Sequence, residues 1–276
     1  PNIRLLSFFL DDGILIGRQD DLTRAFDLLL TMGPQHGLHL NPSKSLIWCG
    51  DPNPDDRDPL HRGVPRAAAD GFLLLGAPVG NIPFSRDVVS ARVEKINAIF
   101  DLLPSLNDAH IEFSLLRHCF SLPKFAYCLR TSNPTHLQPI YTYFDSLQAS
   151  SFSRILGRPL TDAGRTQAFL PVKLGGAGLR SATLHSAAAF ISSISQTAPI
   201  LNSLLPPQSS RRSLNDAFTL LQSASGNANY SSLTLLPPNF TQHSLSSKID
   251  LFTYSNLLNS SVVRDQYAEA RPKRIL

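Results

Sequence analysis

The sequence predicts an α+β protein in which a small mixed region precedes a mainly helical one. Short apolar stretches bounded by turn residues predict strands early in the chain, at Leu5–Leu10, Ile14–Ile16 and Phe72–Leu75. Beyond residue 82 the apolar positions change to steps of three and four, which is the stripe of an amphipathic helix. That stripe comprises Val89, Val93, Ile96, Phe100 and Leu103. We therefore expect a boundary between the two regions near residue 82.

Composition limits the classes of protein to which the chain can belong. With 276 residues and 42% hydrophobic content it can bury substantial cores, and its net charge of +4 is only mildly basic. Three cysteines without a Cys-x-x-Cys pair argue against a disulfide framework, so we expect an intracellular protein, nuclear or cytoplasmic. No apolar run approaches the roughly 20 residues of a membrane span, and we expect no membrane partner. Because the chain starts at Pro1 without a signal-peptide pattern, we expect a fragment.

The mixed region, residues 1–82, is expected to begin with a β-hairpin over residues 5–17 whose turn is Asp11-Asp12-Gly13. A helix capped by Asp20 or Asp21 should follow and should end near Gly33-Pro34. The other elements expected here are a short strand at Leu38–Leu40, a turn at Asn41–Lys44, a polar loop at residues 51–66 and a strand at Phe72–Leu75.

Residues 83–160 are expected to form a helical domain, and residues 161–276 a region of helices and linkers. The first predicted helix starts at about Arg86. The second spans about Asn107–Leu122, is interrupted by Pro123, and has inward-facing residues at Leu115, Leu116, Cys119 and Phe120. The third spans about Pro139–Leu156. The glycine-rich stretch Leu174–Leu179 predicts a loop before a further helix from about Ser181. Nothing in residues 192–262 points to chemistry.

The adjacent carboxylates of Asp11 and Asp12 form the strongest candidate site in the sequence. Like charges this close repel each other, and Asn-Gly would serve a hairpin turn better. Hard divalent cations such as Mg²⁺ remove the repulsion and prefer oxygen ligands. An acidic turn held by apolar strands is what a two-metal phosphoryl-transfer site requires. The alternative is a solvated Asp-Asp-Gly turn, which the segment Phe8–Gly13 taken by itself favours.

Three segments, in order, resemble motifs of the reverse transcriptases. Phe8–Gly13 resembles their aromatic-x-Asp-Asp box, with Phe9 where tyrosine is usual. After one predicted helix, Gly37–Lys44 resembles the next motif of the family, Gly-Leu-x-x-Asn-x-x-Lys. Phe72–Gly76 resembles the primer-gripping hairpin that closes the palm domain. Each motif alone has low specificity, whereas the ordered set is fairly specific.

The resemblance extends beyond the palm motifs, to cover about residues 3–185. Leu115-Leu116-Arg117 with Cys119, and then Leu170–Gly176, resemble the thumb and post-thumb segments of non-LTR retroelement polymerases. The resemblance therefore implies an RNA-directed DNA polymerase. Residues 1–82 would be the end of its palm, residues 83–160 its thumb and residues 161–276 a post-thumb region.

The resemblance also implies a metal site. Asp11 would bind metal directly, and Asp12 would support the metal or its water. In such enzymes two ions, Mg²⁺ or Mn²⁺, lie between this pair and a further Asp on an earlier strand. Because no residue before Asp11 is acidic, the resemblance implies that a missing N-terminal fingers and palm segment supplies that Asp. The chain alone should then be inactive.

The implied partners are an RNA template, a DNA primer and deoxynucleoside triphosphates. Lys44 would lie close to the triphosphate as a charge partner or proton donor, although a surface lysine beside a turn is an equally open interpretation. Phe9 and Gly76 would contact the primer. The alternative interpretations are that Phe9 is simply a buried strand residue and that Gly76 simply ends a strand. Arg117 and Lys124 are expected to contact the template-primer backbone. The alternative is that they are solvated, as most basic residues on helix surfaces are.

Other interpretations also stay open. A decayed or domesticated remnant would bind nucleic acid or a partner without catalysis, and an unrelated α+β protein would carry the acidic pair by chance. The retained Asp11, Asp12 and Lys44 favour an enzymatic ancestry. The remaining candidate ligands match neither a zinc module nor a calcium loop: His118, Cys119, Cys128 and His136, and the aspartates at 51, 55, 56 and 58.

Overall fold

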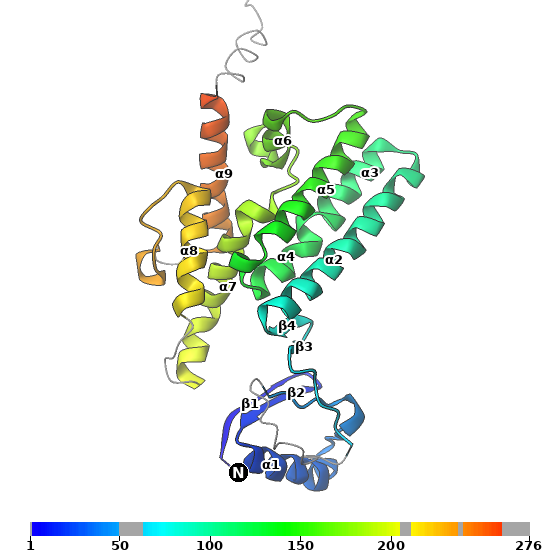
Figure 1. The fold of residues 1–276 in the computed structure, drawn as a ribbon, viewed down its shortest axis with the longest axis vertical. Coiled ribbons are helices and arrows are strands. Elements are labelled where there is room, and N and C mark those ends of the chain that lie inside the picture. The colour runs from blue at the N-terminus through cyan, green and yellow to red at the C-terminus, as the bar shows by residue number, and fades with distance from the viewer. Residues whose placement is uncertain (1, 50–62, 205–210, 237–239, 261–276) are drawn as a thin grey trace, which may run out of the picture. The chain divides into compact units, whose positions relative to one another are not determined.

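Two units make up the chain in the computed structural model, which describes residues 2–49, 63–204, 211–236 and 240–260 (Figure 1). Unit 1 is Pro1–Ser85 with Ala198–Gln208, and unit 2 is Arg86–Thr197 with Ser209–Leu276. The two antiparallel sheets belong to unit 1, and unit 2 is helical in its described residues. The α+β class is therefore confirmed.

Unit 1 contains two β-hairpins and one long helix among its described residues. Its elements are β1 (Ile3–Phe9), β2 (Asp12–Gly17), α1 (Gln19–Met32), β3 (Gly71–Leu74) and β4 (Ala77–Gly80). Strand β1 pairs with β2, and β3 pairs with β4. The predicted first hairpin, the helix that follows it and the strand at Phe72–Leu75 are confirmed. Residues 50–62, which hold most of the predicted polar loop and its aspartates, lie outside the described residues.

Two local predictions in unit 1 are wrong. No strand forms at Leu38–Leu40, because the Leu38 N–H donates to the Gly33 carbonyl at 3.0 Å. Gly37, at φ 78°, makes the left-handed turn that brings this backbone back onto the helix end. Asp20 and Asp21 do not cap α1 but lie in its first turn, where their charges favour the helix dipole.

Unit 2 is built from eight helices in its described part. These are α2 (Ile82–Leu102), α3 (Ala109–Leu115), α4 (Leu122–Thr131), α5 (Gln138–Leu156), α6 (Asp162–Phe169), α7 (Ala182–Leu204), α8 (Arg211–Ser225) and α9 (Gln242–Asn259). The first residues of α2 and the last of α7 belong to unit 1. Within the described residues no helix has the length and apolarity needed to cross a bilayer.

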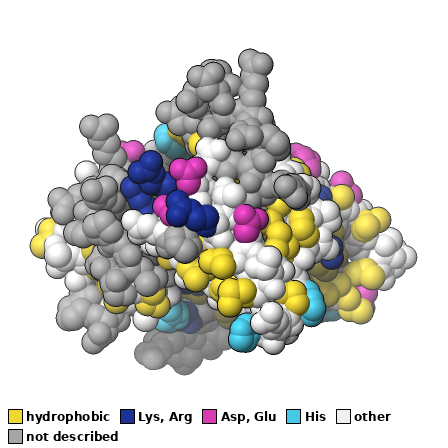
Figure 2. Space-filling model, turned by 90° about the horizontal axis from the view of Figure 1, so that it is seen from below, with side chains coloured by type: hydrophobic (Ala, Val, Ile, Leu, Met, Phe, Trp, Pro, Cys, Tyr) yellow, Lys and Arg dark blue, Asp and Glu magenta, His cyan; other side chains and the backbone are white. Residues whose placement is uncertain are grey.

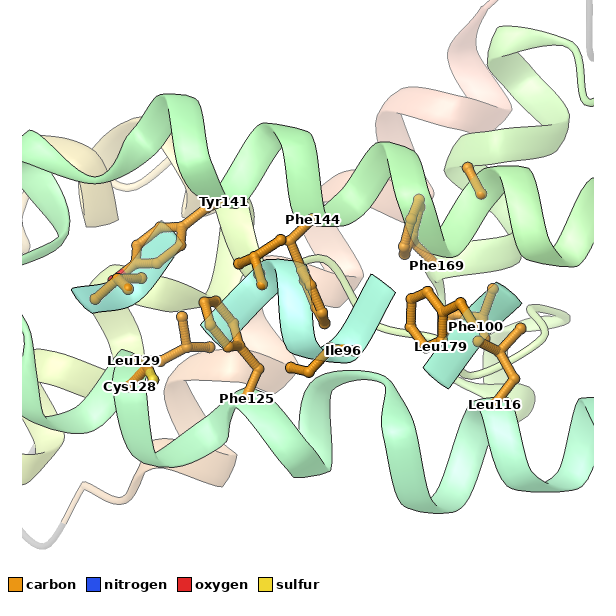
Figure 3. Packing of buried hydrophobic residues seen from close by; sticks show 14 of the residues in the cluster. Ile96, Phe100, Leu116, Phe125, Cys128, Leu129, Tyr141, Phe144, Phe169 and Leu179 are labelled. Carbon is orange, nitrogen blue, oxygen red and sulfur yellow. The ribbon is translucent and has the colours of Figure 1, made fainter. Parts of the chain in front are cut away.

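Aromatic side chains fill the core between α2, α4 and α5 (Figure 3). Phe125 of α4 stacks on Phe144 of α5 with ring centroids 4.6 Å apart, and it meets Tyr141 edge-on at 5.7 Å. The stripe predicted for α2 faces this core, since all five of its residues are buried. A second apolar cluster joins α7, α8 and α9 through Phe190, Phe218 and Ile249.

The helix predicted at 107–122 is interrupted by a π-helical turn at Leu116–Phe120. A π turn holds one more residue than an α turn and rotates the following side chains around the axis. Leu116 is fully buried as expected, but Cys119 is exposed, so its predicted inward orientation is wrong. Pro123 does not end a helix. It lies in the first turn of α4, where the backbone N–H that proline lacks would have no partner within the helix.

Candidate metal and nucleic-acid site

The acidic pair lies at the end of the β1–β2 hairpin, in a register that differs by one step from the prediction. Phe9 pairs with Asp12, so the loop consists of Leu10 and Asp11, and Asp12 and Gly13 already belong to β2. Leu10 has φ 54°, a left-handed conformation that is unfavourable for a bulky side chain. A strained residue thus stands directly before the two carboxylates, and strain of this kind gathers at functional sites.

The residue opposite Gly13 on the neighbouring strand leaves no room for a side chain at position 13. Phe8 pairs with Gly13, and a Cβ added at Gly13 would lie 2.6 Å from Cε1 of the Phe8 ring. The Phe8 ring therefore occupies the space that a side chain on residue 13 would need. The glycine that follows the acidic pair serves this packing.

The end of the hairpin is open to solvent. Asp11 and Asp12 are exposed, and Phe9 and Leu10 expose 61% and 86% of their surface. Other apolar side chains of the same hairpin are also exposed, namely Leu6, Phe8 and Ile16. Figure 2 shows hydrophobic side chains reaching the surface beside acidic and basic ones. Isolated two-stranded hairpins are marginal in water, and contiguous exposed apolar residues mark a surface that another segment covers.

Lys44 ends a short 3₁₀ turn, Pro42–Lys44, which Asn41 caps. The Asn41 Oδ1 accepts hydrogen bonds from the Ser43 N–H at 3.1 Å and the Ser43 hydroxyl at 2.7 Å, so the predicted turn at Asn41–Lys44 is confirmed. The Lys44 side chain is exposed, and within the described residues no ion pair joins it to Asp11 or Asp12. The described residues therefore show no direct charge pairing between Lys44 and the acidic pair.

Gly76 belongs to the turn of the second hairpin. Leu74 pairs with Ala77, which leaves Leu75 and Gly76 as a two-residue loop with φ values of 48° and 81°. Positive φ at both positions is the type I′ geometry that suits a twisted hairpin, and glycine adopts it without strain. The segment that resembles a primer-gripping hairpin is therefore a hairpin. The Trp48 ring lies against Phe72 on β3, with centroids 5.4 Å apart.

Arg117 and Lys124 lie in unit 2, on either side of the end of the π-helical turn. Arg117 is part of that turn and passes across Gly178, where an added Cβ would lie 2.8 Å from the Arg117 Nε. Lys124 is exposed in the first turn of α4. Gly178, at φ 78°, thus leaves room for the guanidinium beside the glycine-rich loop.

A buried carboxylate that the sequence did not single out lies on α5. Asp145 accepts hydrogen bonds from the Ser181 hydroxyl at 2.5 Å and from the Ala182 and Thr183 N–H groups at 2.7 and 3.1 Å. Burial raises the pKa of Asp145, and these hydrogen bonds oppose that shift. Asp145 therefore caps the N-terminus of α7 from a neighbouring helix.

A second buried group joins α7 to α9. Asp250 receives the Arg180 Nη2 at 3.0 Å on one carboxylate oxygen and lies 3.3 Å from the His185 Nε2 on the other. Burial lowers the pKa of His185, and Arg180 adds to the shift while Asp250 opposes it. Both groups could have been found in the sequence as ionisable residues within an apolar helical stripe. Such residues are seldom buried without a partner.

The metal-binding capacity of the described residues is limited. No cluster of three or more His, Cys, Asp or Glu residues suited to a metal ion occurs in this part of the chain. Cys119 is exposed and Cys128 is buried, and no zinc site forms there. Asp11 and Asp12 together could offer two carboxylates, fewer ligands than a complete coordination shell for a hard divalent cation needs.

Comparison with known proteins gives one partial similarity. A segment of 60 residues is 33% identical to the retrotransposable element SLACS 132 kDa protein of Trypanosoma brucei gambiense. It covers 22% of this chain and 5% of that protein. No family model and no solved structure matches the chain. The similarity relates part of the chain to a retroelement protein.

Proposed function

We propose that the chain is the end of the palm, and the thumb, of an RNA-directed DNA polymerase of a non-LTR-like retroelement. The observation that carries this proposal is the acidic pair at a strained hairpin turn, with Asp11 in the two-residue loop next to Leu10 at φ 54° and Asp12 at the start of β2. The partial similarity to a retrotransposable element protein supports it. So does the ordered set of motifs from Phe8–Gly13 to Leu170–Gly176.

Asp11 and Asp12 fit divalent cations by the chemistry of their oxygen atoms, and Mg²⁺ or Mn²⁺ are the ions proposed. Carboxylates are preferred ligands of hard cations, which commonly use one or two of them together with substrate phosphates. In the proposed enzyme Asp11 holds the metal and Asp12 supports it. When bound, a pair of such ions activates a primer 3′-hydroxyl and neutralises a leaving pyrophosphate.

The exposed hairpin supports a further strand from a separate fingers and palm segment. Phe9 and Leu10 are the most exposed apolar residues of the hairpin, and both of its strands carry others. A sheet partner would bury these side chains and place another carboxylate near Asp11. We infer that Asp11 and Asp12 alone bind a single cation weakly, and that the two-metal site is completed only when that segment is present.

Nucleic-acid contacts are assigned to residues of both units. In this proposal Phe9 and Gly76 meet the DNA primer, and Lys44 meets the triphosphate of the incoming nucleotide. Arg117 and Lys124 hold the backbone of the RNA template and DNA primer. Charges of this kind add affinity that falls with salt and that carries no sequence information.

The test is primer extension by a longer polymerase that contains this chain and the upstream segment. Asp11→Asn should abolish extension while primer-template binding stays within about twofold, since the amide keeps the shape and removes the charge. The matched control is Asp20→Asn, an exposed aspartate in the first turn of α1. An Asp11→Asn enzyme with full extension activity would refute the assignment. Binding without any extension by the unmutated enzyme would support the non-enzymatic remnant instead.

A further inference from the structure

A cavity in unit 2 is lined by residues that have no place in the proposed polymerase site. It lies between α5, α6, α7 and α9 and has a volume of about 350 Å³. Pockets of this size hold small organic ligands, usually with an apolar wall and a few polar groups. The apolar wall here consists of Phe169, Leu170 and Leu184.

The buried end of the cavity is formed by Asp145, Ser181, His185 and Asp250. Its two carboxylates already have partners within the protein. Asp145 binds the start of α7, and Asp250 binds Arg180. Their charges are therefore compensated, so this end does not select a cation.

His185 brings an unused acceptor to the same end. Its ring is fully buried, and within the described residues its Nδ1 has no hydrogen-bond partner. The Nε2 lies 3.3 Å from an Asp250 carboxylate oxygen, which places the proton of the neutral ring on Nε2. Arg180 approaches the same Nε2 at 3.4 Å but makes its closer contact, 3.0 Å, with Asp250. Nδ1 then keeps an unpaired lone pair, but neighbouring atoms shield it from solvent, so the cavity does not present it to a ligand.

The outer end of the cavity is cationic. Arg165 is half-buried, and its guanidinium carbon lies 6.0 Å from the centre of the Phe169 ring. In the described part of the chain no acidic side chain pairs with this guanidinium. Thr166 and Thr253, also half-buried, line the same cavity. An anionic group, phosphate above all, matches a guanidinium that keeps its donors free.

We propose that this cavity binds a nucleoside monophosphate. Its phosphate meets Arg165, its base lies against the apolar wall of Phe169, Leu170 and Leu184, and its sugar hydroxyls meet the hydroxyls of Thr166 and Thr253. A free nucleotide and the 5′-phosphorylated end of a strand share this chemistry. The assignment does not depend on the proposed polymerase function.

The experiment is a titration of the intact 276-residue chain with AMP, followed by backbone amide NMR shifts. Saturable shifts are expected at Thr166, Thr183 and Thr253, and AMP should bind at least about tenfold more tightly than adenosine or inorganic phosphate. Arg165→Gln should weaken AMP about tenfold and leave adenosine unchanged. The matched control, Arg158→Gln, replaces an exposed arginine that does not line the cavity and should change neither.

Further arms identify the source of the phosphate and guard against misfolding. Binding of a 5′-phosphorylated oligonucleotide, but not its 5′-hydroxyl form, would assign a strand end, whereas binding of AMP alone would assign a free nucleotide. Thr253→Val, which removes a hydroxyl and keeps the shape, should weaken AMP in a chain with unchanged helical circular dichroism. Inorganic phosphate as tight as AMP, or AMP binding that Arg165→Gln leaves intact, would overturn the proposal.

Discussion

Asp12 pairs with Phe9 across the β1–β2 hairpin, which leaves only Leu10 and Asp11 to make the turn. This register places the acidic pair on the turn and on the first residue of β2. It also forces Leu10 to φ 54°. The conformation of the turn and the position of the carboxylates are thus two consequences of one pairing.

The strain at Leu10 predicts that Leu10→Gly stabilises the protein. Glycine adopts positive φ freely, and a leucine there costs about 1 kcal/mol. Because Leu10 is 86% exposed, little packing is lost. We expect a gain of up to about 1 kcal/mol in the free energy of unfolding, from urea titration. The control, Leu6→Gly in β1, has no such strain to relieve and should destabilise. A loss at both positions would contradict the described turn.

Gly176 should tolerate no side chain. A Cβ there would approach the Leu170 carbonyl carbon and oxygen and the Gln167 carbonyl oxygen, all within 2.6 Å. These are backbone atoms that cannot turn away, so Gly176→Ala should cost about 2–3 kcal/mol of stability. Gly175 is the matched control: it has φ 77° but open space, and Gly175→Ala should cost about 1 kcal/mol. Equal costs in thermal denaturation would contradict the described loop.

The pH dependence of stability should carry a contribution from His185. Burial and Arg180 lower its pKa below the ordinary 6.5, so the unfolded chain binds more protons below that pH. The contribution is complete above pH 6.5 and is lost as pH falls, with a slope of at most about 1.4 kcal/mol per pH unit.

The measurement compares variants, because the raised pKa of Asp145 acts in the opposite sense. His185→Gln should flatten the dependence between about pH 5 and 7. His243→Gln, at an exposed position on α9, should retain the full slope. A His185→Gln protein with an unchanged slope would show that His185 titrates as in the unfolded chain.

Breaking the buried link between α7 and α9 should be costly. Asp250→Asn removes the charge that compensates Arg180 and faces His185, and we expect a loss of about 3 kcal/mol in the free energy of unfolding. Asp216→Asn changes an exposed aspartate of α8 and should stay within about 0.5 kcal/mol. A small loss at Asp250 would mean that Arg180 does not need its compensating charge.

Features set by neighbouring residues were predictable from the sequence. Apolar spacing predicted the buried stripe of α2, and turn residues predicted the first hairpin. Two of the wrong predictions also have local causes. The π turn rotates Cys119 outward, and the Leu38 N–H bonds to the Gly33 carbonyl at the end of α1 and so does not join a strand. A single extra residue in a π turn shifts the phase of the apolar pattern, and a helix this short repeats the pattern too few times to reveal the shift.

The buried groups of unit 2 depended on contacts between distant segments. Asp145 meets Ser181, and Arg180 meets Asp250, only after α5, α7 and α9 have packed together. The sequence shows each residue as one polar position on a helix. Only the tertiary arrangement shows that these side chains neutralise one another around a cavity.

Paramagnetic broadening by Mn²⁺ tests the central claim most directly, in the 276-residue chain itself. Asp20 and Asp21 provide an internal control, as another adjacent acidic pair that lies at the positive end of the α1 dipole, which disfavours a cation. We predict that low Mn²⁺ broadens the amide signals of Leu10–Gly13 before those of Asp20 and Asp21, and that Asp11→Asn abolishes this preference. Broadening that leaves the hairpin untouched, or that persists in Asp11→Asn, would contradict a cation site on this turn.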